Sequence, residues 1–153
     1  MKIGGVTLTP PPEEILVLPR DPEPIVFRAR AVTDWDQFET MVPDPKPPVM
    51  LVKGEGQKLD YDDVGYKALV NAKNAQRMAW MVVKSLEPSA IEWDTVDLLR
   101  PSTLLNWEAD LLNGGLLQIE VNKVYELCQI ANCLDETKLE AARKSFLRGQ
   151  QAA

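Results

Sequence analysis

The chain has 153 residues, of which 45% are hydrophobic and 26% are charged, and its formal net charge is −6. These proportions are typical of one globular domain with a core of its own, and they differ from those of disordered chains. The acidic balance argues against DNA or RNA as a partner, because binding phosphates requires an excess of lysine and arginine. The longest mostly apolar run, 78–83, is too short to cross a bilayer, and the first residues do not have the pattern of a signal peptide. We therefore expect a single cytosolic domain without a membrane span.

The absence of histidine removes several classes of function. Ser-His-Asp and Cys-His catalytic arrangements are excluded, and the commonest zinc ligand is missing. The glycine pairs Gly4-Gly5 and Gly114-Gly115 are not followed by the residues that complete a phosphate-binding loop. We expect no catalytic site, no metal site and no cofactor.

Two clusters of carboxylates are the remaining candidates for chemistry. They are Asp60, Asp62 and Asp63, and Glu92, Asp94 and Asp97. The first cluster lacks the glycine and the bidentate glutamate of a calcium-binding loop, and helix capping or solvated charge explains both clusters better. An enzyme acting through carboxylates stays an alternative, which requires one cluster to converge in a deep pocket with raised proton affinity.

The two cysteines, Cys128 and Cys133, lie close together near the end of a predicted helix. Their five-residue spacing is unsuitable for a disulfide without a rearranged backbone. Free cysteine is usually buried, so we expect both thiols to be reduced and in the core.

The N-terminal part, residues 1–53, is predicted to be rich in β-strand. Residues 25–32 alternate between an apolar face with Phe27 and Ala29 and a solvated face with Arg28 and Arg30. The other predicted strands, at 3–8, 15–18 and 49–53, are separated by prolines and by a short helix that begins at Thr33. We expect the strands to form one small antiparallel sheet.

The rest of the chain comprises a polar loop at 54–63, a helical part at 64–148 and a frayed tail at 149–153. Apolar residues recur at three- and four-residue steps over 64–86, which predicts a long central helix with Lys73 and Arg77 pointing outward. Further helices are predicted at 103–112 and 116–132, and a last one after Asp135 with Leu139, Ala142 and Phe146 facing inward. The expected fold class is α+β, a small N-terminal antiparallel sheet packed against a C-terminal bundle of four to five helices.

Several short phrases follow one another in a recognisable order. They are Phe27-Arg28-Ala29-Arg30-Ala31, Lys46-Pro47-Pro48, the long helix ending in residues 79–86, Trp93, Asn106-Trp107-Glu108, and a closing helix at 124–134. In this layout the chain resembles the tail assembly chaperones of long-tailed bacteriophages. The resemblance covers nearly the whole chain and depends on the order of elements and these short phrases.

The resemblance implies a non-enzymatic role in the cytoplasm of an infected bacterial host. Such chaperones bind the helical tape measure protein, keep it soluble, help recruit tail tube protein around it and are absent from the finished tail. Many are made in two lengths through a ribosomal frameshift, and the ending at 149–153 suits a shorter form. The family has no motif that defines its contact residues, so none is transferred to this chain.

Four residues are candidates for an apolar groove that would shield the helices of a partner. They are Trp93, Trp107, Leu116 and Tyr125. The alternative for each is ordinary core packing, which is commoner for large apolar side chains, whereas a contiguous exposed patch would favour binding.

A second functional hypothesis is a structural virion component, such as a tail or baseplate adaptor. In that case the edge strands of the β-rich part would pair with neighbouring subunits in a ring. A homo-oligomer is compatible with both hypotheses.

Overall fold

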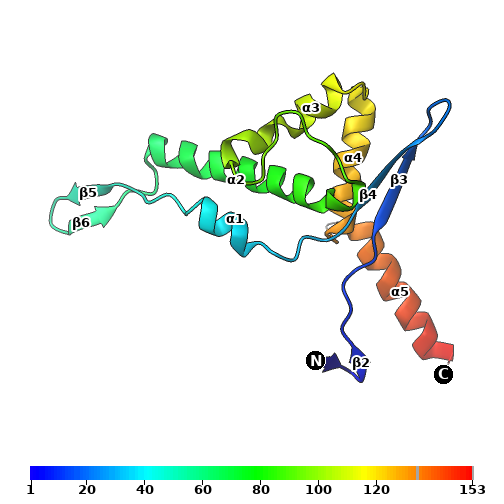
Figure 1. Cartoon of the computed structure of the whole chain (residues 1–153). Coiled ribbons are helices and arrows are strands. Elements are labelled where there is room, and N and C mark those ends of the chain that lie inside the picture. The colour runs from blue at the N-terminus through cyan, green and yellow to red at the C-terminus, as the bar shows by residue number, and fades with distance from the viewer. Residues whose placement is uncertain (134, 153) are drawn as a thin grey trace.

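The computed structural model describes residues 1–133 and 135–152. The elements follow in the order β1 (Lys2–Ile3), β2 (Val6–Thr7), β3 (Glu14–Leu18), β4 (Ile25–Ala29), α1 (Asp36–Met41), β5 (Val49–Val52), β6 (Gly56–Leu59), α2 (Val64–Ser85), η1 (Glu87–Ser89), η2 (Pro101–Asn106), α3 (Trp107–Asn113), α4 (Gln118–Ala131) and α5 (Glu136–Ala152). The fold is α+β, as predicted. Three parts extend from a body built around α2: the N-terminal hairpin, the β5–β6 hairpin and α5 (Figure 1).

The strands form separate hairpins, and the prediction of a single sheet is wrong. Over the described residues, β1 pairs with β2, β3 with β4 and β5 with β6, each pair antiparallel. Proline-rich segments at 10–12 and 43–48 separate these pairs, and proline lacks the N–H group that would continue a ladder. Residues 3–8 fold back at Gly4 and Gly5, which both have positive φ angles. The predicted loop at 54–63 contains β6.

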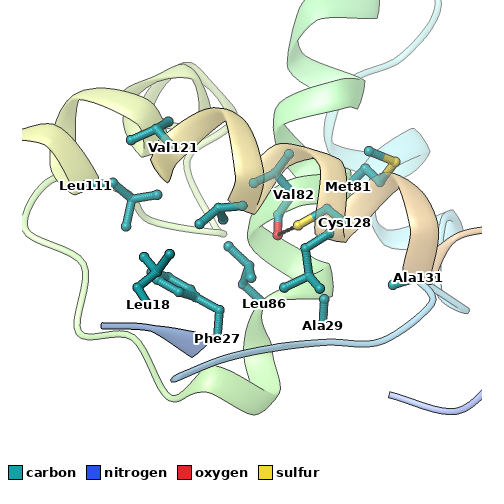
Figure 2. Packing of buried hydrophobic residues seen from close by; sticks show 12 residues of the cluster. Leu18, Phe27, Ala29, Met81, Val82, Leu86, Leu111, Val121, Cys128 and Ala131 are labelled. Carbon is teal, nitrogen blue, oxygen red and sulfur yellow. Dashed lines mark hydrogen bonds between the residues drawn. The ribbon is translucent and has the colours of Figure 1, made fainter. Parts of the chain in front are cut away.

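The β3–β4 hairpin packs on α4 and supplies one side of the main core (Figure 2). Phe27 and Ala29 are buried, whereas Arg28 and Arg30 are exposed, so the predicted alternation along this strand is confirmed. Leu18 is buried at the end of β3 and packs in the same cluster. The hairpin therefore covers the apolar side of α4 and of the end of α2.

Helix α2 begins where Asp63 accepts a hydrogen bond from the backbone N–H of Tyr66 at 2.8 Å, which is an N-cap. Its second half is buried from Ala79 to Val83, as the sequence predicted for a central helix. Met81 and Val82 pack in the main cluster, and Ala79 and Trp80 pack in a second cluster with Phe38 and Leu104. The same helix therefore joins both halves of the core.

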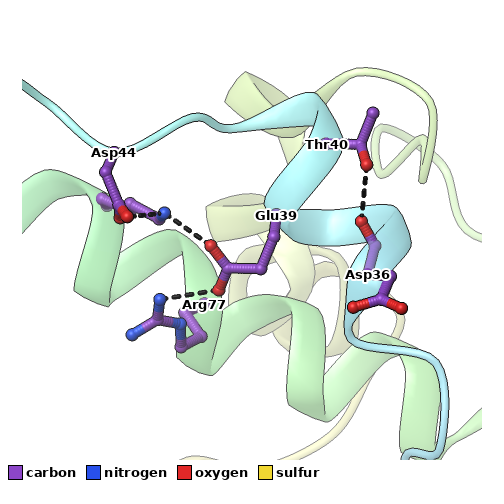
Figure 3. Close-up of polar contacts among 6 residues, drawn as sticks. Asp36, Glu39, Thr40, Asp44 and Arg77 are labelled. Atoms are coloured by element: carbon purple, nitrogen blue, oxygen red, sulfur yellow. Dashed lines mark hydrogen bonds and ion pairs between the residues drawn. The ribbon is translucent and has the colours of Figure 1, made fainter.

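Helix α1 is tied to α2 by an ion-pair network (Figure 3). Glu39 accepts hydrogen bonds from Lys73 at 2.6 Å and from Arg77 at 2.7 Å, and Asp44 accepts one from Lys73 at 2.5 Å. Lys73 is 5% exposed, so the expectation that it points into solvent is wrong. The two carboxylates offset the cost of covering its ammonium group.

A polar junction joins β4 to α2 and α4. Asn132 donates to Ser85 Oγ at 2.8 Å and to the Cys128 carbonyl at 2.7 Å, and it accepts from the Val32 backbone N–H at 2.9 Å. The carbonyl of Ser85 also accepts from the backbone N–H of Arg30 at 3.0 Å. These bonds hold the chain leaving β4 against the ends of both helices.

The C-terminal end corrects two expectations about burial. Cys128 is buried, but Cys133 is exposed with a φ angle of 58°, because it lies in the turn that leads the chain away from α4. Helix α5 then runs to Ala152, through the tail predicted to fray. None of its residues, all of them described, is buried, so Leu139, Ala142 and Phe146 do not face the core as predicted.

Phe27→Ala should destabilise the protein by about 3–5 kcal/mol, because it removes a ring from a filled core. Val26→Ala is the matched control on the other face of the same strand, since Val26 is 39% exposed and Phe27 is 3% exposed. Urea unfolding followed by tryptophan fluorescence measures both. Equal losses of stability in the two variants would contradict this orientation of β4.

Candidate partner-binding surfaces

The four residues predicted to form a groove come together in two pairs. Trp107 of α3 and Tyr125 of α4 stack with ring centroids 6.2 Å apart and an interplanar angle of 18°. Trp93 and Leu116 line a shallow cavity of about 150 Å³ together with Ile91 and Leu111. All four are half-buried against the main core. They therefore serve core packing with one side and leave the other side open.

The connector that carries Trp93 is held by a buried carboxylate. Asp110 of α3 accepts hydrogen bonds from the Thr95 backbone at 2.9 Å, from Thr95 Oγ1 at 2.6 Å and from the Val96 backbone at 3.3 Å. Burial opposes ionisation of Asp110, but these bonds outweigh it and lower the pKa of the carboxyl. The anion thus fixes the loop against α3.

The start of α4 is held by a bidentate ion pair. Arg20 donates from Nη1 and Nη2 to the two carboxylate oxygens of Glu120, each at 2.7 Å. Glu120 also accepts from the Leu117 backbone N–H at 2.9 Å. The bond from Arg20 and then that from Leu117 lower the pKa of Glu120 to about 2. This clamp joins the β3–β4 turn to the first turn of α4.

Exposed aliphatic residues extend this surface beyond the predicted four. Leu117 and Ile119, at the start of α4, are 63% and 67% exposed. Leu117 follows Leu116 directly and Ile119 is two residues further on, so the open side of this surface continues along the first turn of α4. The helical pattern of the sequence does not distinguish these two residues from core residues, and the observed packing shows that both are outside.

Sequence reasoning missed two other apolar surfaces. One is the α5 stripe, which we define as Leu139, Ala142 and Phe146, with Leu139 50% and Phe146 64% exposed. The other is the outer face of the β5–β6 hairpin, where Val49, Leu51 and Leu59 are exposed. Both lie on elements that extend from the body (Figure 1). The α5 stripe is visible in the sequence as a helical pattern, but its partner is not.

The two acidic clusters mainly cap backbone groups. Asp63 caps α2, and Asp60 accepts from the Asp62 backbone at 3.0 Å. Asp97 accepts from the Leu99 backbone at 2.9 Å and from Arg100 at 3.0 Å, and these two bonds lower its pKa. Among residues 1–133 and 135–152, no set of three or more acidic or cysteine side chains is arranged to hold a metal ion.

A larger cavity, of about 500 Å³, lies between the proline-rich segment before β3 and the end of α2. Its charged lining is already engaged, since Glu87 pairs with Arg30 at 3.1 Å and with Lys84 at 2.7 Å.

In the part of the chain that is described, no helix combines the length and apolar content needed to cross a membrane.

The Glu120 clamp predicts a specific pH dependence of stability. Because the pKa of Glu120 is lowered to about 2 in the folded state, its contribution is complete above the ordinary value of 4.5 and is lost as the pH falls towards 2. Glu120→Gln should therefore be less stable than the parent at pH 7, and the difference should shrink below about pH 5. Urea titrations at several pH values measure this.

Glu126→Gln is the control on the same helix, because the pair of Glu126 with Lys123, at 3.2 Å, is exposed. A stability difference for Glu120→Gln that does not change between neutral and acidic pH would contradict the clamp.

Comparison with known proteins adds no relative from which a function can be taken. No protein-family model, no curated protein and no solved structure matches this chain. What the chain does must therefore be inferred from its own residues.

Proposed function

We propose that this chain is a non-enzymatic tail assembly chaperone of a long-tailed bacteriophage, acting in the cytoplasm of the infected bacterium. It binds the tape measure protein, keeps it soluble and helps recruit tail tube protein around it. The observation that carries the proposal is α5, a helix of 17 residues with no buried side chain and an apolar stripe along one side. The layout of short phrases in the sequence supports the same role.

The α5 stripe has the spacing of a helix-pairing surface. Leu139, Ala142 and Phe146 follow one another at steps of three and four residues, so they lie on one side of the helix. A solitary helix of this length is marginal in water, and a second amphipathic helix packed on the stripe would stabilise it. A tape measure protein before assembly offers such helices.

The charges of α5 add little to recognition on the stripe. Arg143 lies beside the stripe and pairs with Glu140 at 3.5 Å, whereas Lys144 and Arg148 share the opposite side of the helix with Ala141. The partner helix that fits this side is therefore defined mainly by an apolar stripe of its own.

The surface around Trp107 and Tyr125 is a second place for contact with the same partner. Its aromatic rings are already held by stacking on each other, so little side-chain entropy is lost on binding. Leu117 and Ile119 add exposed aliphatic area beside it. A partner helix covering this area would bury surface that is now in water.

Co-expression with the tape measure protein encoded in the same genome tests the proposal. The chain should raise the soluble fraction of that protein and co-purify with it. Replacing both Leu139 and Phe146 with glutamate should weaken the complex at least about tenfold, because charges would enter the apolar contact. The soluble fraction and a pull-down from the same cells measure both effects.

Ala141→Glu is the matched control, because residue 141 lies on the opposite side of α5 from the stripe. It should leave the complex intact. A tape measure protein that stays insoluble and unbound with the unaltered chain would refute the chaperone role. Complex formation that the double variant leaves unchanged would refute the use of α5.

The structural virion component remains the second candidate, and the free edges of the hairpins favour it. β5 and β6 pair with each other alone among the described residues, so strands of a neighbouring subunit could join them. Mass analysis of purified particles separates the two roles. A stoichiometric copy number in the finished virion would support the structural component and contradict a transient chaperone.

A further inference from the structure

Strand β3 has an open edge at Ile15 and Val17. On the other strand of this hairpin, Arg28 donates from its backbone to Ser89 Oγ at 2.8 Å and its carbonyl accepts from the same hydroxyl at 2.7 Å. The backbone of Arg28 therefore points away from β3. Ile15 is the partner of Arg28 in the register, so in an antiparallel ladder its backbone groups point outward too, as do those of Val17.

One edge of this hairpin is covered and the other is free. The β4 edge is occupied by η1 through the Ser89 bonds. In residues 1–133 and 135–152, no backbone hydrogen bond outside the ladder engages Ile15 or Val17. Their side chains are also exposed, at 54% and 55%. The β3 edge is thus an unpaired template with aliphatic side chains.

Strand β5 has an open edge of the same kind. Asp60 donates from its backbone to the Pro48 carbonyl at 2.8 Å, so the pair formed by Pro48 and Asp60 is bonded across the hairpin. The alternation of an antiparallel ladder then turns the backbone groups of Val49 and Leu51 outward. The side chain of Leu51 is 82% exposed.

The two hairpins have opposite charge. The β5–β6 hairpin, residues 49–59, contains Lys53 and Lys58 against Glu55, a net of +1. The β3–β4 hairpin, residues 14–29, contains Glu14, Asp21 and Glu23 against Arg20 and Arg28, a net of −1. Opposite charges on two open strand edges favour their pairing and guide the encounter.

The two edges belong to different ends of the molecule. Figure 1 shows the β5–β6 hairpin beyond the start of α2 and the β3–β4 hairpin beside the end of α2. Helix α2, with 22 residues, separates them by about 30 Å at a rise of 1.5 Å per residue. One copy therefore cannot pair its own edges.

We propose that copies of this chain associate head to tail, with β5 of one copy added antiparallel to the β3 edge of the next. The outward backbone groups bond when Val49 lies opposite Val17 and Leu51 opposite Ile15. This register places Lys53 opposite Glu13. The β5–β6 hairpin is an extending arm that the next copy receives as a third and fourth strand.

The joined sheet has a continuous apolar row. Directly opposed residues share a face, so Val26, Val17, Val49 and Leu59 lie side by side across the four strands. All four are exposed in the single chain. Pairing also relieves the weakness of an isolated two-stranded hairpin, since sheets of more strands are more stable in water. Because the two contacting surfaces differ, the association continues into a chain or closes into a ring.

Sedimentation equilibrium over a wide concentration range tests the association without any partner protein. The mass should rise with concentration from the 17.1 kDa of one chain. Val17→Pro and Leu51→Pro should each remain near the mass of one chain, because each removes an outward N–H group and leaves the bonds within its own hairpin. In an equimolar mixture of these two variants, the mass should rise to that of two chains and no further, since each variant supplies the edge that the other lacks.

Leu59→Pro is the matched control on the unused edge of the same hairpin, and it should associate like the parent. Lys53→Glu should weaken association, and adding Glu13→Lys should restore it. A mass that stays at one chain at every concentration would overturn the proposal. The same holds if Val17→Pro and Leu51→Pro associate normally, or if Leu59→Pro is as damaging as Leu51→Pro.

The proposal concerns self-association and does not depend on the chaperone role. Failure of the sedimentation experiment leaves binding of the tape measure protein through α5 unaffected. Failure of the co-expression experiment leaves head-to-tail association unaffected.

Discussion

The burial of the second half of α2 is the constraint on which the other elements depend. Ala79 and Trp80 pack towards α1 and η2, and Met81, Val82 and Leu86 pack towards α4 and the β3–β4 hairpin. A helix that is apolar nearly all round must be covered on every side. The Asn132 junction and the Lys73 network bind these covering elements with polar contacts that packing alone would not specify.

Because the core is concentrated at this end of α2, other apolar residues are left outside it. The β5–β6 hairpin follows a proline-rich segment and extends past the start of α2, and α5 departs after the turn at Cys133 (Figure 1). Val49, Leu51 and Phe146 are therefore in water in the isolated chain. These exposed apolar elements are the surfaces on which both proposals of binding depend. The proposed partner helix and the proposed neighbouring copy would use different elements.

The sequence predicted what local periodicity controls. The alternation around Phe27 and Ala29 indicates which face of the strand is buried, and the helical steps leading to Trp80 indicate a buried helix. The structure confirms both, together with the fold class. The sequence also suggested helix capping for the cluster that contains Asp63, and Asp63 caps α2 in the structure. These features depend on residues close together in the chain.

The sequence-based predictions that were wrong concern contacts between residues far apart in the chain. Lys73 is covered because Glu39 and Asp44 approach it from about 30 residues away, and no local pattern indicates that. The α5 stripe is a correct helical pattern, but periodicity cannot tell a side facing its own core from one facing a partner. The sequence suggested the four groove residues one by one. It did not predict that Trp107 and Tyr125 stack or that Leu117 and Ile119 are exposed beside them.

Native-state hydrogen exchange on the isolated chain at low concentration tests most directly the division into a packed body and open extending elements. Amides of α2 from 79 to 85 and of α4 should exchange slowest, through global unfolding, because their side chains form the core. Amides of β5, β6 and α5 should exchange far faster, through local opening. Protection of α5 and the β5–β6 hairpin equal to that of α2 would contradict this division.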